Sequence, residues 1–346
     1  MSRALAIAAA ATLLLTACDR APAPAPAPTL TPATTPASAT PSPTATPAST
    51  PPAVRGVPAP AAWEPDALAP VEMSAPGQDI VWALLTSIDG PALFRSTNRG
   101  DTWESRGLPP GIARGQVSFL GDREGWLGAS GPASVRCPEA TLVLWRTTDA
   151  GDTWTQVTTR DAGGALCAGT VSFVSPTTGF LGGARSNGGV TLYRTDDGGG
   201  TWRAAAALPG IDAAGGALSL GTVRAFGSTL LLVTNPFAAP QSQGRRIVYR
   251  STDGGATWSR LAETGASLGL ASASRWIVLD APGESRESTD AGATWHPFVT
   301  DYSQASPIPP VVHFAGANVG YATTRSTIQR TIDGGVHWTR IPTPDR

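Results

Sequence analysis

Short apolar segments alternate with polar, glycine-rich segments along most of the chain. Four of the apolar segments end in arginine followed by serine or threonine, at residues 93–96, 144–147, 192–195 and 248–251. Short runs rich in branched and aromatic side chains, bounded by turn-forming residues, are typical of β-strands. We predict that each of the four is the third strand of a small sheet.

A second pattern with fixed spacing predicts the first two strands of each sheet. An apolar segment ending in phenylalanine is followed, six residues after that phenylalanine, by glycine and an aromatic residue. The pattern occurs at residues 117–119 with 125–127, 171–173 with 179–181, and 312–314 with 320–322. We interpret each as an antiparallel hairpin, and we take the residues after the next box tryptophan, such as 155–157 and 339–341, as the fourth strand.

Between the third and fourth predicted strands lies an octapeptide, Ser/Thr-x-Asp/Asn-x-Gly-x-x-Trp, which occurs six times. The copies are residues 96–103, 147–154, 195–202, 251–258, 288–295 and 331–338. Successive tryptophans are 37 to 56 residues apart, which is the length of one small antiparallel sheet per repeat.

The residue types of the octapeptide predict a self-contained turn. The acceptor at the third position can receive hydrogen bonds from backbone N–H groups of its own turn, and the first-position hydroxyl can add another. The fifth-position glycine suits a positive φ, and the tryptophan can pack back over the turn. A calcium site is the alternative, but each turn has too few acidic groups to form one. We therefore predict structural roles, and no metal or other cofactor, for Asn98, Asp149, Asp197, Asp253, Asp290 and Asp333 with Trp103, Trp154, Trp202, Trp258, Trp295 and Trp338.

The octapeptide resembles the Asp-box, or bacterial neuraminidase repeat, of sialidases, sortilin-type receptors and xyloglucanases. Over residues 71–346 the hairpin and the box together most resemble the photosystem II assembly factor-like repeat family, most clearly at 249–258. The resemblance implies a β-propeller, and members with a known role assist the assembly of membrane proteins.

The fold predicted from these patterns is all-β. Sheets of four short strands cannot bury their faces alone, and radial stacking leaves few exposed edges. We expect a β-propeller of four-stranded antiparallel blades with Asp-box turns. The six boxes favour six blades, and residues 61–78 could add strands to a seventh or complete the ring. An open solenoid is the alternative.

The first sixty residues differ in character from the rest. Residues 1–17 combine a basic start with an apolar stretch too short to span a bilayer, which predicts a signal peptide. The sequence before Cys18 resembles a lipoprotein lipobox, which implies lipid attachment at Cys18 and an extracytoplasmic, membrane-anchored protein; Asp19 resembles an inner-membrane retention residue if the organism is Gram-negative. An ordinary secreted protein is the alternative. Residues 18–60, rich in Ala, Pro, Thr and Ser, predict a disordered linker, and 61–346 the propeller domain.

Composition limits the partners. The net charge is −1, so no broad basic field exists for nucleic acid or for anionic lipid. Two further cysteines, Cys137 and Cys167, flank the second box. They are either a disulfide of an oxidising compartment or two free thiols. We expect a monomer.

An arginine precedes five of the six boxes, while Glu287 takes this position in the fifth repeat. In a propeller, equivalent positions lie at equivalent radius, so the arginines would form a broken ring suited to an acidic protein or a carboxylated ligand. Alternatively, each arginine pairs with an acidic group of a neighbouring blade. The candidate partner-binding residues are Arg95, Arg146, Arg194, Arg250 and Arg330.

Sialidases, which share the box, use an arginine triad, a tyrosine nucleophile and an acid/base carboxylate. The Arg-Ile-Pro segment typical of their first strands occurs here only at residues 340–342, after the last box. Tyr302 is the tyrosine outside the repeated motifs, and the three histidines show no metal or triad spacing. Glycosidases also need two facing carboxylates, and the sequence nominates no pair. We therefore expect no catalytic residues.

The leading functional hypothesis is a non-catalytic, lipid-anchored propeller that binds a protein partner, as an assembly or stability factor for an envelope membrane complex. Glycan binding or hydrolysis at the cell envelope is the second hypothesis. The repeat pattern is specific for the fold and says little about the partner.

Overall fold

The computed structural model describes residues 51–60, 64–65, 71–87, 89–130, 142–160, 170–184, 190–210, 218–236, 246–303 and 308–344. The predicted signal peptide, Cys18, the linker up to residue 50, Cys137 and Cys167 lie outside these ranges. Residues from Ser49 to Arg346 form one compact unit. No helix in the described ranges is long and apolar enough to cross a membrane.

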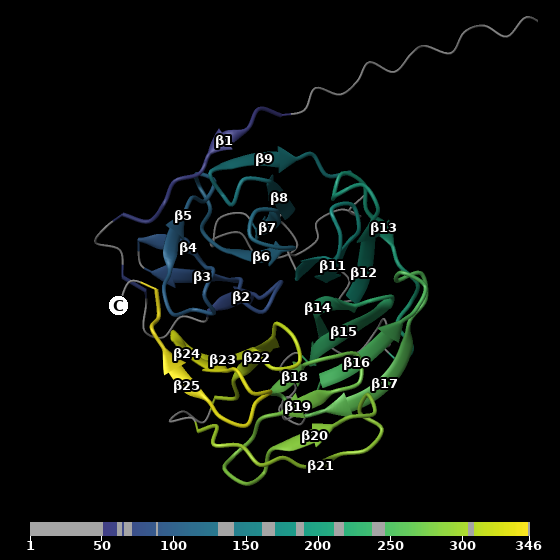
Figure 1. Cartoon of the computed structure of the whole chain (residues 1–346). Helices are drawn as coiled ribbons and strands as arrows, with labels where there is room; N and C mark the ends of the chain where they lie inside the picture. Colours follow the sequence, from purple (N-terminus) through teal and green to yellow (C-terminus); the bar gives the residue numbers. More distant parts are fainter. Residues whose placement is uncertain are drawn as a thin grey trace, which may run out of the picture. The chain divides into compact units, whose positions relative to one another are not determined.

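The described residues form six antiparallel sheets, arranged as the blades of a propeller (Figure 1). Each contains four consecutive strands, and the second has β1 (Val54–Arg55) as a fifth strand at its outer edge. The first blade contains β2 (Glu72–Ser74), β3 (Val81–Ser87), β4 (Gly90–Ser96) and β5 (Glu104–Arg106). The second contains β6 (Gly115–Phe119), β7 (Gly125–Ser130), β8 (Leu142–Thr147) and β9 (Thr153–Val157). The third contains β10 (Val171–Phe173), β11 (Gly179–Ala184), β12 (Val190–Thr195) and β13 (Arg203–Ala204).

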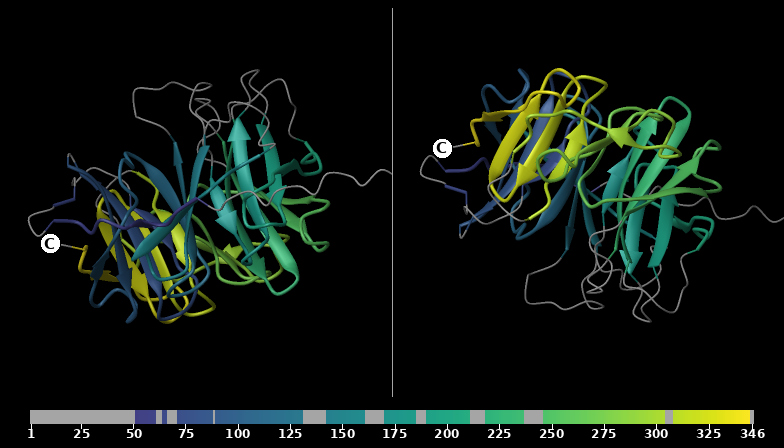
Figure 2. Two further views of the ribbon diagram at one scale, coloured as in Figure 1. Left: turned by 90° about the horizontal axis from the view of Figure 1, so that it is seen from above. Right: turned by 90° about the horizontal axis from the view of Figure 1, so that it is seen from below.

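The remaining three blades repeat this order. The fourth contains β14 (Leu218–Phe226), β15 (Thr229–Pro236), β16 (Arg246–Ser251) and β17 (Ser259–Thr264). The fifth contains β18 (Leu268–Leu270), β19 (Trp276–Val278), β20 (Arg286–Ser288) and β21 (His296–Pro297). The sixth contains β22 (Val311–Phe314), β23 (Gly320–Thr324), β24 (Thr327–Thr331) and β25 (Thr339–Ile341). First strands lie near the centre of the ring and fourth strands at its rim (Figure 1). Figure 2 shows the same ring from above and from below.

The predicted strands and the blade number are confirmed. The apolar segments before the boxes are third strands, the phenylalanine–glycine pattern marks the first hairpin, and the residues after the tryptophans are fourth strands. Residues 72–74 form the first strand of the first blade instead of contributing to a seventh, so the ring in the described part of the chain has six blades.

The hydrophobic core is divided into six clusters, and each lies between two neighbouring blades. In two of them a tryptophan of one second strand stacks face to face on a phenylalanine of the next blade's first strand. The ring centroids of Trp82 and Phe119 are 3.6 Å apart at an interplanar angle of 4°, and those of Trp126 and Phe173 are 3.9 Å apart at 8°. Blade-to-blade contact therefore supplies the core that a single sheet lacks.

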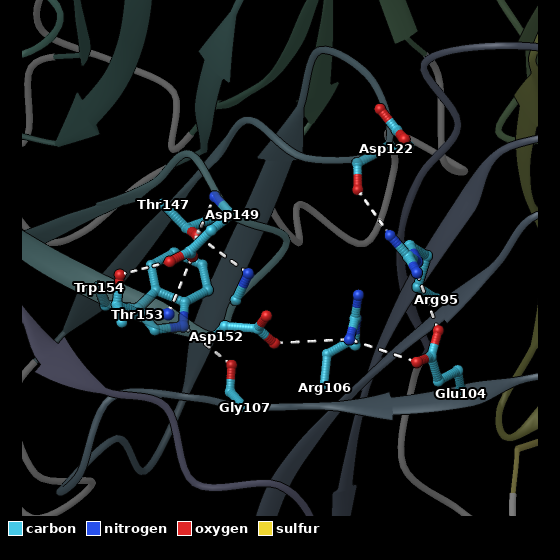
Figure 3. A network of polar contacts seen from close by, with 11 residues as sticks. Arg95, Glu104, Arg106, Gly107, Asp122, Thr147, Asp149, Asp152, Thr153 and Trp154 are labelled. Atoms are coloured by element: carbon cyan, nitrogen blue, oxygen red, sulfur yellow. Dashed lines mark hydrogen bonds and ion pairs between the residues drawn. The ribbon is translucent and has the colours of Figure 1, made fainter.

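The boxes form the predicted hydrogen-bonded turns, as the second box shows (Figure 3). The Thr147 hydroxyl accepts from the Gly151 N–H at 2.9 Å and donates to Asp149 Oδ1 at 2.8 Å. Asp149 Oδ1 in turn accepts from the Thr153 N–H at 2.9 Å. All six boxes repeat these three bonds, including the first, where Asn98 replaces aspartate.

Boxes also contact the preceding blade, which the residue pattern did not predict. A Cβ on Gly199 of the third box would lie 2.3 Å from Leu144 of the second blade, so the fifth position needs glycine for space as well as for its φ of 104°. In the second box the Trp154 indole N–H donates to the Gly107 carbonyl beside the first blade at 2.9 Å. The boxes thus fasten one blade to the next.

The two ends of the ring meet without sharing a strand. The first blade contains only β2–β5 and the sixth only β22–β25. One core cluster spans the two blades. The Trp103 indole N–H donates to the Pro342 carbonyl at 2.9 Å, and Arg330 pairs with Asp101 at 2.7 Å. We call this junction the seam.

A short strand begins inside the segment that was predicted to be a disordered linker. Strand β1 (Val54–Arg55) pairs antiparallel with Thr153 and Trp154 of β9, and Val57 then bridges to Leu108 after the first blade. The local composition hid this pairing, because backbone hydrogen bonds and a close approach of glycines hold the segment instead of a large apolar face. A Cβ on Gly56 would lie 2.2 Å from the Gly151 carbonyl oxygen.

We predict that Gly56→Ala detaches this segment, because the added methyl group collides with backbone that cannot rotate away. The expected loss in free energy of unfolding is roughly 1–3 kcal/mol, measured by urea denaturation, with faster proteolysis before residue 60. Gly77→Ala is the matched control, since nothing lies within 4 Å of its added Cβ. Equal stability of the two variants would contradict the prediction.

Candidate functional site at the central channel

The strands of each blade are in the same register, so one row of side chains crosses every blade from centre to rim. In each blade this row begins with one residue of the first strand, next to the central channel. From the first blade to the sixth, these residues are Ser74, Ser118, Ser172, Arg224, Gly269 and His313. In the same order, they lie opposite Trp82, Trp126, Phe180, Leu231, Ile277 and Tyr321 of the second strands.

The three serines link the first four blades. The Ser74 hydroxyl accepts from the Phe119 N–H at 3.0 Å, Ser118 from the Phe173 N–H at 2.8 Å, and Ser172 from the Val223 N–H at 3.0 Å. Each bond joins a first strand to the next one around the channel. This ladder ends at the fourth blade, where arginine replaces serine.

Arg224 links the fourth blade to the fifth and sixth. Its Nη1 donates to the Leu270 carbonyl at 3.0 Å, and its Nη2 donates to the Phe314 carbonyl. Gly269 takes the equivalent position in the fifth blade, where a Cβ would lie 2.5 Å from Val312 and 2.8 Å from the Phe314 ring of the sixth blade. Burial lowers the pKa of Arg224 to about 10, so the group stays charged at neutral pH.

The channel holds an electrostatically unusual histidine. Burial, together with the positive charges of Arg224 and Arg246, lowers the pKa of His313 to about 4. Burial also lowers the pKa of Arg246 and raises that of Glu72. At neutral pH His313 is therefore uncharged, while the arginines around it carry positive charge.

A cavity of about 370 Å³ opens at the end of the channel where the first strands begin. Its charged lining residues are Glu72, Arg224, Arg246 and Arg325. Beside them Ile308 and Val311 are 44% and 41% exposed. We call Glu72, Arg246, Ile308, Val311 and Arg325 the channel mouth. A second cavity of about 370 Å³ lies toward the other end and shares Arg224 and His313 with the first.

The arginines before the boxes occupy the same rows but lie nearer the rim, and four of the five are paired. Arg95 pairs with Glu104 at 2.9 Å and donates to the Asp122 carbonyl of the second blade at 3.0 Å (Figure 3). The other pairs are Arg146–Glu124 at 2.5 Å, Arg194–Asp196 at 2.7 Å and Arg330–Asp101 at 2.7 Å. Pairing with acidic groups thus holds for these four, although only Asp101 belongs to a neighbouring blade.

Arg250 differs from the other four arginines. It is exposed and has no ion-pair partner among the described residues. Arg95 and Arg146 also lie over the rings of Trp82 and Trp126, at 5.8 and 5.0 Å from the centroids. No continuous ring of unpaired guanidinium groups therefore exists in the described structure, and partner binding by these residues stays a prediction.

The fifth blade reverses the charge pair of the second. Glu287 stands where the other blades have arginine, and it pairs with Arg275 at 2.5 Å. Arg275 occupies the position that Glu124 has in the second blade, before the second strand. The two ion pairs join equivalent positions of the second and fifth blades with the charges exchanged. Either arrangement of the two charges is therefore compatible with this position in a blade.

Tyr302, the candidate nucleophile in a sialidase-like reading, is buried in the structure. Its ring contacts Trp338 edge-on with centroids 5.4 Å apart, and it hydrogen-bonds to Thr324. Burial raises its pKa, which opposes formation of a phenolate. Within the described ranges, no group of three or more His, Cys, Asp or Glu side chains could hold a metal ion.

The channel residues were not among the candidates from the sequence. His313 could have been found, because aligning 312–314 with 117–119 places it at the position of Ser118. Arg224 was harder to find, since a register shift between Leu220 and Val223 interrupts the first strand of the fourth blade. Arg246 and Glu72 lie at strand ends, and only the ring brings them together.

We predict that the Glu124–Arg146 pair tolerates reversal. Arg146→Glu alone places two carboxylates together and should lower the free energy of unfolding by about 1 kcal/mol. The double variant Glu124→Arg with Arg146→Glu should recover most of this loss, as the fifth blade does naturally, although the contact with Trp126 is lost. Urea denaturation of the three proteins measures the coupling, and no recovery in the double variant would disprove it.

The pKa of His313 predicts an acid-sensitive step in stability. Between pH 6.5 and about 4 the unfolded chain binds a proton at this residue that the folded chain does not. Stability should therefore fall as the pH falls through this window, by on the order of 1–3 kcal/mol.

The comparison for this prediction is His313→Ser, which restores the residue found in the first three blades. Its free energy of unfolding should depend less on pH between 7 and 4 than that of the unsubstituted chain. Hydrogen bonds from Thr294 lower the pKa of Asp290 to about 2, so this carboxylate also makes stability fall as the pH falls toward 4. Because it is present in both proteins, its effect cancels from the comparison. Parallel curves for the two proteins would refute the assignment.

Comparison with known proteins agrees with this architecture. The BNR/Asp-box repeat matches residues 249–260, and no curated protein matches the chain. AofleA from Arthrobotrys oligospora is 14% identical, with a TM-score of 0.54, and the match covers 80% of this chain and 88% of that one.

Two other solved structures also match the chain. The α-L-arabinofuranosidase arb93a of Fusarium graminearum, in complex with an iminosugar inhibitor, is 10% identical and has a TM-score of 0.50. The match covers 78% of this chain and 92% of that one. YCF48 bound to D1 peptide is 17% identical and has a TM-score of 0.44, and the match covers 82% of this chain and 99% of that one. The family match and the six boxes in six blades identify the chain as a β-propeller with BNR/Asp-box repeats.

Proposed function

We propose that the chain is a non-catalytic propeller that binds a protein partner at the channel mouth. Lipid attachment at Cys18 would hold it on the extracytoplasmic side of a bacterial membrane, as a monomer. The partner that suits such a tether is a membrane complex or an assembly intermediate of one. The observation that carries the proposal is the chemistry of the channel mouth.

The channel mouth combines apolar and cationic groups at one opening. Ile308 and Val311 expose hydrocarbon beside Arg246 and Arg325, and Glu72 is the single acidic residue among the described residues that line the cavity. Exposed apolar side chains next to arginine are typical of protein-binding surfaces. A partner segment with apolar and acidic side chains would match both features.

The same lining supports binding over hydrolysis. Retaining and inverting glycosidases both place two carboxyl groups across the scissile bond. The described residues around the two cavities offer one carboxyl group, Glu72, and Tyr302 is held against Trp338. These features support a binding role for the channel.

The proposal predicts that a partner cross-links from the channel mouth. A photoreactive amino acid at Val311, introduced into the full chain in its native host, should give one main protein adduct in the membrane fraction. The same group at Val299, which is 86% exposed between the fifth and sixth blades, is the matched control and should not give it.

The Val311 adduct should also disappear when Arg325→Glu is added, because an acidic partner segment would be repelled. Adducts that are identical at the two valines, or that survive the charge reversal unchanged, would argue against the channel mouth as the interface. An adduct that contains carbohydrate instead of protein would favour the glycan hypothesis.

A further inference from the structure

The cavity at the channel mouth has a charge imbalance inside the protein. Arg224, Arg246 and Arg325 line it together, whereas Glu72 is the single carboxyl group among its described lining residues. Among the described residues, none of the three arginines forms an ion pair. By contrast, four of the five arginines before the boxes have acidic partners.

The hydrogen bonds of Arg224 do not remove this imbalance. Its partners are the Leu270 and Phe314 carbonyls, which satisfy N–H groups but bring no negative charge. Arg246 lies close enough to act on His313 together with Arg224. His313, which lines the same cavity, is uncharged at neutral pH and adds no further positive charge, so the arginines set the potential of the cavity.

The opposite wall supplies hydrogen-bond acceptors. Gln116 and Glu72 occupy equivalent register positions on the neighbouring first strands β6 and β2. The Gln116 Oε1 atom is buried and accepts no hydrogen bond from the described residues. A buried acceptor without a donor costs roughly 1–3 kcal/mol, so this wall favours a ligand that donates.

We infer that the cavity binds a small organic carboxylate that also carries a hydroxyl group, with its carboxylate at Arg246 and Arg224 and its hydroxyl group toward Gln116 and Glu72. A cavity of about 370 Å³ is within the usual range for small-molecule sites. Guanidinium groups match carboxylates in shape and charge. This ligand is distinct from the protein partner proposed above, and it is tested with the purified chain alone, so the two ideas can fail separately.

The test is isothermal titration of the purified full chain with malate, a hydroxydicarboxylate, and with malamide, its neutral diamide. Malate should bind and malamide should not. Arg246→Gln should weaken malate binding at least about tenfold, a loss of about 1.4 kcal/mol. Arg340→Gln is the matched control, because Arg340 is an exposed arginine of β25 outside the cavity lining, and its affinity should be unchanged.

A second readout distinguishes binding in the cavity from binding elsewhere. The chain has three histidines, and their ring resonances can be titrated separately by NMR. Malate in the cavity offsets the charge of the arginines, so the midpoint of His313 should rise, while that of the exposed His337 should stay unchanged.

Absence of malate binding at millimolar concentration would overturn the inference. So would equal affinities for malate and malamide, equal affinities of Arg246→Gln and the unsubstituted chain, or binding that leaves the midpoint of His313 unmoved. Arg246→Lys keeps the charge and should retain more affinity than the glutamine variant, which separates loss of charge from damage to the fold.

Discussion

A four-stranded blade cannot bury both of its own faces, and the structure follows from that constraint. Every hydrophobic cluster in the described chain lies between two blades, so each blade completes the core of its neighbour. The stacked pairs Trp82–Phe119 and Trp126–Phe173 show how closely two sheets approach. The box glycines serve the same end, because a side chain at Gly199 would push the third blade away from Leu144.

The fold could be predicted from the sequence because each blade is marked by a local motif, the box. The box turn is a local structure, fixed by hydrogen bonds within eight residues, so its residue types reveal it in all six copies. Strand order and blade number follow from the spacing of those copies. The fold was therefore predicted nearly complete from patterns of short range.

The candidate site was not predicted, because its residues meet only when the ring closes. Arg224 and His313 are 89 positions apart in the sequence and become neighbours of one channel across a blade that has glycine at the same position. For the arginines before the boxes, the sequence left two interpretations open, a partner-binding ring and pairing with acidic groups. In the structure, four of the five are held by acidic side chains, and two of these also lie over aromatic rings. Repetition of a residue in a repeat protein thus reflects packing as readily as binding.

The seam is the junction at which neighbouring blades, the first and the sixth, are not consecutive in the sequence. Its contacts join residues more than two hundred positions apart, such as Arg330 with Asp101 and Trp103 with Pro342, so they form only after both ends of the domain are folded. The channel mouth lies along the same line, since Glu72 comes from the first blade and Val311 from the sixth. A ring that parted there would open its central cavity to the side, between the first and sixth blades.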